Sequence, residues 1–254
     1  MADLTVEHLS LRFGGLTVLD NVSFAVEPGD LMALIGPNGA GKTSVFNCIS
    51  GIYHASGAIR FRDIDLIGRS PHEIARLGVA RTFQHGELFA GMSVLENLLT
   101  GRHARIATHP LAEMLFLPSV RRSEVTHRKA VERIIDVVEL ERYRHVPVGD
   151  LSFGVQKLVG FARALALEPA VILMDEPSAG LNREEREDLA RFILRIKHEL
   201  TMTIVWIEHD MQMIGDLADR IHVLDYGRTI AEGEPQGVLN DPKVLAAYLG
   251  TTSL

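Results

Sequence analysis

One eight-residue stretch has the composition and spacing of a phosphate-binding loop. Residues 36–43 read Gly-Pro-Asn-Gly-Ala-Gly-Lys-Thr. The glycines let successive backbone N–H groups turn toward an anion, and the helix expected to follow adds its positive end. In this pattern Lys42 reaches the β- and γ-phosphates of a nucleotide, and the Thr43 hydroxyl binds Mg²⁺. The residues expected to line the site are Gly36, Pro37, Asn38, Gly39, Ala40, Gly41, Lys42, Thr43 and Ser44.

Two carboxylates and a histidine follow other apolar runs. Asp175 and Glu176 end the run at residues 171–174, and His209 comes shortly after the run at residues 203–207. Both runs are typical of strands buried on both faces of a parallel sheet, and open α/β sheets bind ligands at the carboxyl ends of their strands. There Asp175 can hold Mg²⁺ through water, Glu176 can orient or deprotonate an attacking water, and His209 can face the γ-phosphate.

Three features allow more than one interpretation from the residues alone. Phe13, before two glycines, fits either turn packing or stacking on a base. Gln84, at the end of an expected strand, is by itself typical of a solvated loop. Ser152 and Gly154, at the expected start of a helix, suit either a simple N-cap or an anion site.

Composition limits the class of protein. The 254 residues can bury a large core in one domain or two, and a formal charge of −7 argues against a broad nucleic-acid surface. Cys48 is the only cysteine, which excludes a disulfide framework and a cysteine zinc site. The N-terminus has no signal-peptide pattern, and no apolar run reaches the ~18 residues that cross a bilayer. We therefore expect a soluble, cytoplasmic protein whose role at a membrane would depend on a partner.

Periodicity predicts the elements that would position these groups. A buried strand at residues 31–35 enters the phosphate loop, and a helix at residues 44–50 leaves it. Short strands between residues 4 and 26, with another at residues 58–62, predict a small antiparallel sheet beside the loop. Residues 221–231 are expected to form a closing hairpin around a turn.

The middle of the chain has a helical pattern. Residues 85–165 are expected to form a helical block, in which residues 123–140 have one apolar face. The residues expected to be buried on that face are Val131, Ile134, Ile135 and Val138. Leu88, Phe89 and Met92 are apolar residues in a loop-like setting, where they fit either the core or a partner surface.

The order of these motifs resembles that of the ATP-binding subunit of an ABC transporter, over essentially the whole chain. Residues 36–43 match the Walker A loop, Asp175 and Glu176 match Walker B with the catalytic glutamate, and His209 matches the switch histidine. The remaining matches are Phe13 as the adenine-stacking aromatic, Gln84 as the Q-loop glutamine, residues 178–182 as the D-loop, and Ser152, Gly154 and Gln156 as the LSGGQ signature.

Within that family the sequence resembles the LivG-like group of branched-chain amino acid importers. The segments that carry this resemblance are residues 80–84, 179–182, 207–211 and 247–250. Phe153 replaces the first glycine of the signature, an aromatic common in this group, and Val155 replaces a residue that is usually small or polar. Relatives of the group also import urea, short amides and related compounds, so the transported solute stays open.

The resemblance implies an α/β fold of the P-loop NTPase (RecA-like) type. Residues 1–84 and 166–254 would form a parallel-sheet core with an antiparallel β subdomain, and residues 85–165 a helical subdomain that carries the signature. It also implies ATP hydrolysis with Mg²⁺. The residues expected to hold Mg²⁺ are Thr43, Gln84 and Asp175. The residues expected to be catalytic are Lys42, Glu176 and His209.

Partners are implied as well. Two ATP-binding subunits, either two copies or two related chains, would pair head to tail, with each ATP between one Walker A loop and the other subunit's signature. Two membrane-spanning permease subunits would hold the pair at the cytoplasmic face of the inner membrane, and a periplasmic or extracellular solute-binding protein would act through them. Leu88 and Phe89 are expected in the groove that receives a permease helix, and no nucleic acid is expected.

Two other classes of protein compete with this interpretation. Non-transport ABC ATPases that act on nucleic acid or ribosomes usually have two ATPase units in one chain, long coiled coils or zinc-binding cysteines, and this acidic sequence has none of these. A regulatory nucleotide-binding module without turnover is the other class, and the presence of Glu176 and His209 argues against it.

Overall fold

The strand that enters the phosphate loop lies inside a six-stranded sheet. The computed structural model of the protein describes residues 2–82, 88–105 and 118–249. The strand order is β10-β9-β3-β8-β7-β6, with parallel neighbours throughout except for the antiparallel β9–β10 hairpin. The strands are β3 (Leu31–Ile35), β6 (Val79–Thr82), β7 (Val171–Asp175), β8 (Thr203–Ile207), β9 (Arg220–Asp225) and β10 (Arg228–Gly233). Every residue of β3, β7 and β8 is buried, as expected for strands covered on both faces.

The register of this sheet brings three strand ends together. Leu34 of β3 pairs with Ile207 of β8, and Ile207 lies opposite Asp175 of β7. Because the three strands are parallel, their carboxyl ends meet at one edge. The loops that follow them therefore start side by side.

A second, antiparallel sheet packs beside the first, as predicted. Its order is β2-β1-β4-β5. The strands are β1 (Leu4–Phe13), β2 (Leu16–Val26), β4 (Ser56–Phe61) and β5 (Ile64–Asp65). The prediction of several short strands before residue 26 was wrong, because β1 and β2 are long strands with register shifts. One shift lies between Val6 and Leu9, where His8 has a φ of 52°, and this irregularity interrupts the apolar alternation.

Several helices cover the sheets. Helix α1 begins at Lys42, two residues before the predicted start, because Gly41 in the left-handed region ends the loop. Capping boxes begin α2 at Ser70 and α7 at Asn182. The helices are α1 (Lys42–Ile49), α2 (Pro71–Leu77), α7 (Arg183–Glu199), α8 (Met211–Leu217), α9 (Pro235–Leu239) and α10 (Pro242–Leu249). Helices α8 and α9 were not predicted.

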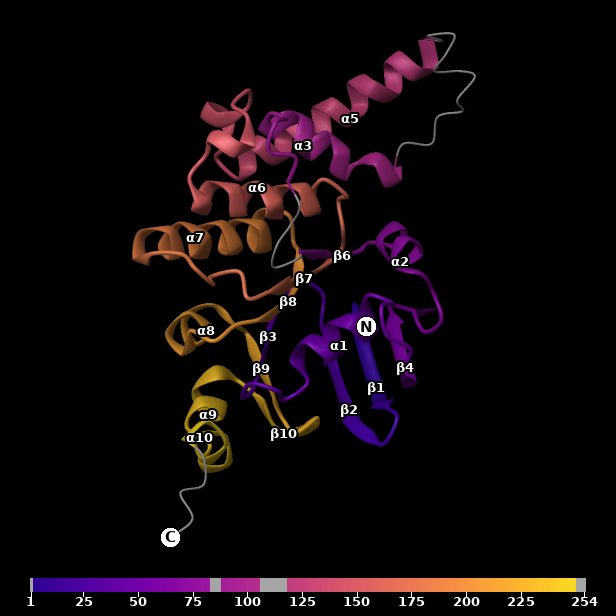
Figure 1. Ribbon diagram of the computed structural model, residues 1–254, viewed down its shortest axis with the longest axis vertical. Coiled ribbons are helices and arrows are strands. Elements are labelled where there is room, and N and C mark those ends of the chain that lie inside the picture. The colour runs from indigo at the N-terminus through magenta and orange to yellow at the C-terminus, as the bar shows by residue number, and fades with distance from the viewer. Residues whose placement is uncertain (1, 83–87, 106–117, 250–254) are drawn as a thin grey trace.

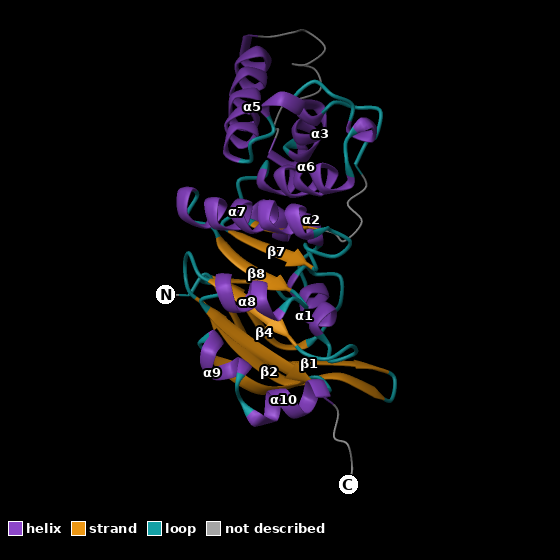
Figure 2. Ribbon diagram, turned by 90° about the vertical axis from the view of Figure 1, so that its left-hand side faces the viewer, coloured by secondary structure: helices purple, strands orange, loops and turns teal. Residues whose placement is uncertain are grey.

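Three more helices lie together at one end of the molecule (Figures 1 and 2). They are α3 (Val94–Gly101), α5 (Pro118–Val137) and α6 (Phe153–Leu165). The predicted apolar residues Val131, Ile134 and Ile135 of α5 are buried, as is Val138 directly after it, although the helix starts and ends earlier than expected. These helices fall within residues 85–165, and the subdomain boundary itself stays a prediction. In the described residues, no helix is long and apolar enough to cross a bilayer.

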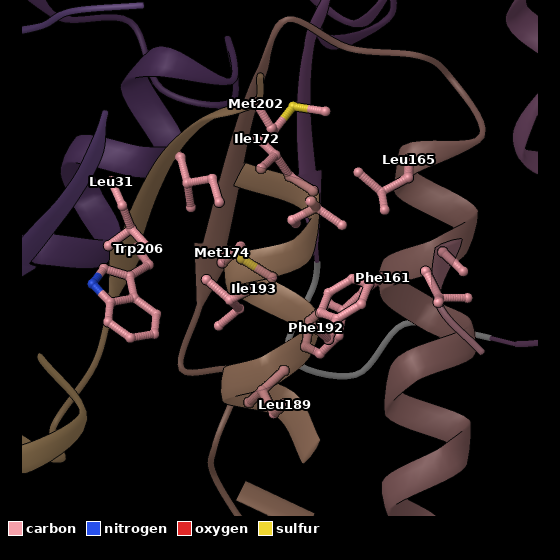
Figure 3. Packing of buried hydrophobic residues seen from close by; sticks show 14 of the residues in the cluster. Leu31, Phe161, Leu165, Ile172, Met174, Leu189, Phe192, Ile193, Met202 and Trp206 are labelled. Carbon is pink, nitrogen blue, oxygen red and sulfur yellow. The ribbon is translucent and has the colours of Figure 1, made fainter. Parts of the chain in front are cut away.

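The buried residues form one cluster on each face of the parallel sheet. Leu31 and Ile35 of β3 belong to one cluster and Met32 and Leu34 to the other, since alternate side chains of a strand point to opposite faces. The first cluster continues into the three helices, and Figure 3 shows how α6 packs through Phe161 on α7. The rings of Phe161 and Phe192 are stacked with centroids 5.8 Å apart. The end helices thus share a hydrophobic core with the sheet.

Candidate functional site

The phosphate loop lies between β3 and α1, as the sequence predicted. Gly36 and Gly41 have φ values of 150° and 102°, which favour glycine. A Cβ on Gly36 would lie 2.0 Å from the Leu224 carbonyl oxygen, so close packing requires glycine there too. On the open side, a Cβ on Gly39 would meet nothing within 4 Å. The loop is therefore packed behind and unobstructed in front, as a cradle for a phosphate chain must be.

Lys42 spans the mouth of this loop. Its Nζ donates hydrogen bonds to the carbonyl oxygens of Gly36 at 2.7 Å and Pro37 at 3.0 Å. Burial lowers the pKa of Lys42, while the carboxylates of Glu176 and Asp175 oppose that effect. The ammonium group is thus held at the loop, near the carboxylates of Glu176 and Asp175.

The donor set fits a magnesium ion carried by nucleotide phosphates. The Thr43 side chain is exposed at the start of α1, and the Asp175 side chain is buried at the end of β7. Mg²⁺ at nucleotide sites takes one or two protein oxygens plus phosphate oxygens and water. Among the described residues, no cluster of three or more histidine, cysteine or acidic side chains could hold a metal ion.

Asp175 also has a partner that the sequence analysis did not assign. Arg81, from β6, places one guanidinium nitrogen 2.7 Å from Asp175 Oδ2 and another 2.6 Å from Asn47 Oδ1. Both members of the ion pair are buried. The sequence feature that could have revealed this pair is an arginine inside a short expected strand, because a buried charge requires a partner.

Glu176 and His209 follow neighbouring strands, as predicted, and their side chains contact each other. His209 Nε2 lies 3.0 Å from Glu176 Oε1. The backbone N–H of Glu176 donates to the Ile207 carbonyl at 2.9 Å, which ties the two strand ends. Glu176 has a φ of 47°, a conformation that non-glycine residues adopt at a cost and often at functional sites. This pair has the geometry of a base and the group that orients it.

Glu208, which the sequence analysis missed, fixes the backbone around that pair. Its buried carboxylate accepts hydrogen bonds from the Ser178 hydroxyl at 2.8 Å and from the His209 backbone N–H at 2.7 Å. The sequence feature that could have revealed this role is a glutamate at the strand end, directly before His209. Glu208 thus joins the loop after Glu176 to the loop that carries His209.

Phe13 lies at the end of β1 with half of its surface exposed (50%). Its ring meets the ring of Tyr53 at a centroid distance of 5.1 Å and an interplanar angle of 83°. The side chain is thus supported from one side without being part of the core. Base stacking by Phe13 stays a prediction.

The signature residues lie at the start of α6. Ser152 caps this helix by accepting from the Val155 N–H at 3.5 Å, and Gln156 donates to the Leu151 carbonyl at 2.9 Å. A five-residue motif that starts at Leu151 ends at Val155, so Gln156 lies one position past the signature and its amide serves the helix start. Gly154 is buried against Glu185. Figures 1 and 2 both show α6 apart from α1, so one chain does not bring its signature to its own phosphate loop.

Two segments near the end of the chain contact the phosphate loop. The Gly227 N–H, in the turn between β9 and β10, donates to the Ala40 carbonyl at 3.0 Å, and the Asp20 N–H donates to the Gly227 carbonyl at 2.8 Å. Tyr248, in α10, accepts a hydrogen bond from the Gly36 N–H, and burial raises the pKa of its phenol to about 12. Gln84, the predicted Q-loop residue, lies outside the described residues.

Comparisons with known proteins identify the family of the chain. The ABC transporter family matches residues 19–179, and the branched-chain amino acid ATP-binding cassette transporter family matches residues 228–252. The chain is 39% identical to the high-affinity branched-chain amino acid transport ATP-binding protein LivG of Escherichia coli and to BraF of Pseudomonas aeruginosa, over 97% of this chain and of each relative. It superposes on the ADP conformation of MJ1267, an ATP-binding cassette of an ABC transporter, with a TM-score of 0.86. That alignment has 34% identity and covers 98% and 99% of the two chains.

These findings confirm the predicted fold class, a P-loop ABC ATPase, and the predicted family. Two family matches cover both the nucleotide-binding part and the C-terminal part of the chain. The matches to LivG and BraF extend over 97% of the chain. The chain therefore belongs to the ATP-binding proteins of the ABC transporter family, in the group that includes LivG and BraF.

Proposed function

We propose that the protein binds ATP with Mg²⁺ at this site and hydrolyses it to drive uptake of branched-chain amino acids or a related small solute. The observation that carries the proposal is the 3.0 Å contact between Glu176 and His209 beside a loop that holds Lys42. A module that only bound nucleotide would need the loop but not this pair. The solute is inferred from the names of the relatives LivG and BraF.

The geometry gives each residue a task in hydrolysis. The loop amides and Lys42 neutralise the phosphates, and Glu176 takes a proton from the attacking water. His209 holds Glu176 in place and contacts the γ-phosphate. When bound between the phosphates, Thr43 and Asp175, Mg²⁺ would withdraw charge from the γ-phosphoryl group. Gln84 remains the predicted third ligand.

A second ATP-binding subunit completes the site in this proposal. Ser152 and Gly154 would contact the γ-phosphate of ATP that is bound to the partner's phosphate loop, since α6 lies apart from α1 in the same chain. Bound ATP would hold the pair closed, and hydrolysis would let it open, as in other nucleotide switches. The partner is either a second copy or a related chain.

A groove on the helical end is proposed as the seat of a permease helix. Phe89 (51% exposed) and Met92 line a 740 Å³ hollow together with Leu99 and Arg163. Asn97 is buried beneath this loop and bonds the backbone of Phe89 in both directions, at 2.9 and 3.0 Å. An exposed aromatic on a fixed loop suits a partner surface. The proposal places the protein at the cytoplasmic face of the inner membrane, bound to two permease subunits.

Two measurements test the proposed function. Steady-state phosphate release from ATP by the purified protein tests turnover, and its absence in the presence of all partner subunits would remove the ATPase role. Purification of the tagged protein from native membranes, followed by mass spectrometry, tests the transport role. We expect two multi-helix membrane proteins and a second small ATPase. Recovery with ribosomal or DNA-associated proteins instead would overturn the importer assignment and leave ATP hydrolysis standing.

A further inference from the structure

A buried arginine connects three elements around the magnesium side of the site. Arg81 is on β6, its ion-pair partner Asp175 ends β7, and its hydrogen-bond partner Asn47 is on α1. The guanidinium carbon also lies 5.6 Å from the centre of the Phe46 ring. A planar guanidinium can donate to two oxygens in different directions, which an ammonium group on a flexible stem does less well.

The position of Asn47 fixes where this guanidinium lies. Asn47 follows Thr43 by four residues in the same helix, so both side chains are on one face of α1, about one turn of 5.4 Å apart. Arg81 therefore contacts the face of α1 that also carries Thr43, and it is paired with the Asp175 carboxylate. Because Oδ2 of Asp175 is bonded to Arg81, Oδ1 is the oxygen that remains to face the ion.

Burial makes the ion pair necessary for this carboxylate. Both side chains are almost fully buried (6% and 9% exposed), and an isolated buried carboxylate is strongly unfavourable. Removal of one member of such a pair leaves the other without compensation. Groups that hydrogen-bond a metal ligand fix its orientation, and their loss typically lowers metal affinity by about 10–100-fold.

We propose that Arg81 is a positioning residue that holds Asp175 in the orientation in which its free oxygen serves Mg²⁺, with Asn47 as the second anchor of the arginine. This inference rests on the proposed function, because it requires ATP to bind with Mg²⁺. It assigns to Arg81 a selective effect on magnesium-dependent nucleotide binding. A merely structural arginine would have no such selectivity.

The test compares ATP affinity with and without magnesium. The affinity of the purified protein for ATP is measured by titration calorimetry in excess EDTA and in excess Mg²⁺, and the ratio of the two dissociation constants is the magnesium gain. We expect Arg81→Met to lower the magnesium gain by about 10–100-fold and to leave the affinity in EDTA unchanged. Arg81→Lys should restore part of the gain, because a lysine keeps the positive charge but lacks the planar guanidinium that bonds Asp175 and Asn47 at once.

Two further variants keep the test decisive. Asn47→Ala retains the ion pair and should lower the gain by less than Arg81→Met does. Arg102→Met is the matched control, because Arg102 is also a buried arginine, bonded to the Ala166 carbonyl at 2.8 Å and paired with Glu168 at 3.3 Å in another part of the chain. We expect Arg102→Met to lower the melting temperature without changing the magnesium gain.

Each result has one meaning. Equal loss of affinity with and without magnesium in Arg81→Met, or an unchanged or larger magnesium gain, would overturn the role of Arg81. If Arg81→Met does not fold, an unchanged gain in both Arg81→Lys and Asn47→Ala would overturn it equally. Failure of the wild-type protein to bind ATP, or to gain affinity from Mg²⁺, would instead remove the proposed function itself.

Discussion

Glu176 and His209 are 33 residues apart in the chain, and the pairing of β7 with β8 brings their side chains together. The strand ends place the backbone of the two residues, but the 3.0 Å contact also requires that the loops after β7 and β8 keep their relative positions. Glu208 holds these loops together, because its carboxylate accepts hydrogen bonds from Ser178 in one loop and from His209 in the other. At the scale of residues, the Glu176–His209 pair is therefore supported by a second carboxylate, that of Glu208.

Replacing Glu176 with glutamine tests its role as the base. Glu176→Gln keeps the shape of the side chain but cannot accept a proton, so we expect ATP binding to persist while phosphate release falls by about 10²–10⁴-fold. Glu187→Gln is the control, because Glu187 is an exposed carboxylate on α7 that pairs only with its neighbour Arg183 among the ion pairs described. Near-normal turnover in Glu176→Gln would remove Glu176 as the base.

The single cysteine provides a probe of α1. Cys48 is buried, and burial raises the pKa of its thiol to about 12. At pH 8 only on the order of one molecule in 10⁴ would carry the reactive thiolate, against roughly a quarter for an exposed cysteine. We therefore expect Ellman's reagent to label the native protein very slowly and the urea-unfolded protein at once. Rapid labelling of the native protein would show that α1 opens from the sheet.

Sequence patterns identified candidate site residues that directly follow an expected strand. They missed Arg81 and Glu208, whose place in the site depends on a contact with a residue elsewhere in the chain. The phosphate loop, Glu176 and His209 each follow a recognisable strand. Arg81 is separated from Asp175 by 94 residues and Glu208 from Ser178 by 30, so nothing local to either residue reveals the contact. Whether Phe13 and Ser152 contact nucleotide still stays a prediction.

At the scale of elements, segments with a continuous apolar run were predictable, and two short helices were not. The buried strands β3, β7 and β8 follow from their apolar composition. Helices α8 and α9 are only seven and five residues long, too short for a periodic signal. The start of α1 depended on the backbone at Gly41, which tertiary contacts of the loop determine.

Two glycines in the end helices test how closely those helices pack. A Cβ on Gly101, the last residue of α3, would lie 2.4 Å from the Arg163 carbonyl oxygen of α6, whereas one on Gly160 of α6 would meet nothing within 4 Å. We expect Gly101→Ala to cost about 1–3 kcal/mol, or roughly 3–10 °C in Tm. Gly160→Ala should add about 0.5–1 kcal/mol, because alanine favours a helix interior.

Thermal unfolding followed by circular dichroism measures both variants against the wild type. The opposite signs provide the internal control, since both substitutions add one methyl group to a helix. Equal shifts in Tm would contradict the close approach of α3 and α6 at Gly101.

At the scale of the whole molecule, the proposed nucleotide site and the proposed partner groove lie on different elements. The phosphate loop and the Glu176–His209 pair follow strands of the parallel sheet, whereas the groove is lined by residues of α3, of α6 and of the loop before α3. Figure 1 shows α3 and α6 together at one end of the molecule, apart from α1. One hydrophobic cluster joins the end helices to the sheet, and close-packed interiors of this kind transmit strain between the elements that share them. Such an arrangement suits a subunit in which a structural change at the nucleotide site alters the surface that binds a partner.

A charge in the proposed groove tests that division. Phe89→Glu would bury an unpaired carboxylate against a permease helix, and we expect transport by the assembled complex to fall tenfold or more, which corresponds to a cost above about 1.4 kcal/mol. Phosphate release by the isolated subunit should not change. The measurements are solute uptake into proteoliposomes and phosphate release in solution.

Val125→Glu is the matched control for this variant. Val125 is an apolar residue of α5 with nearly the same exposure as Phe89 (48% against 51%), outside the groove. Uptake that persists in Phe89→Glu, or falls equally in both variants, would rule out the groove as the permease contact.

The contact between Gly227 and Ala40 joins one of the first loops of the chain to one of its last turns. Both strands that pair with β3, β8 and β9, also come much later in the chain than β3 itself. On the ribosome, the phosphate loop therefore leaves the exit tunnel long before the hairpin that braces it has been synthesised. A chain interrupted before residue 227 lacks this support for the phosphate loop, so we expect it to bind ATP more weakly than the finished subunit, which titration of a truncated chain with ATP would measure.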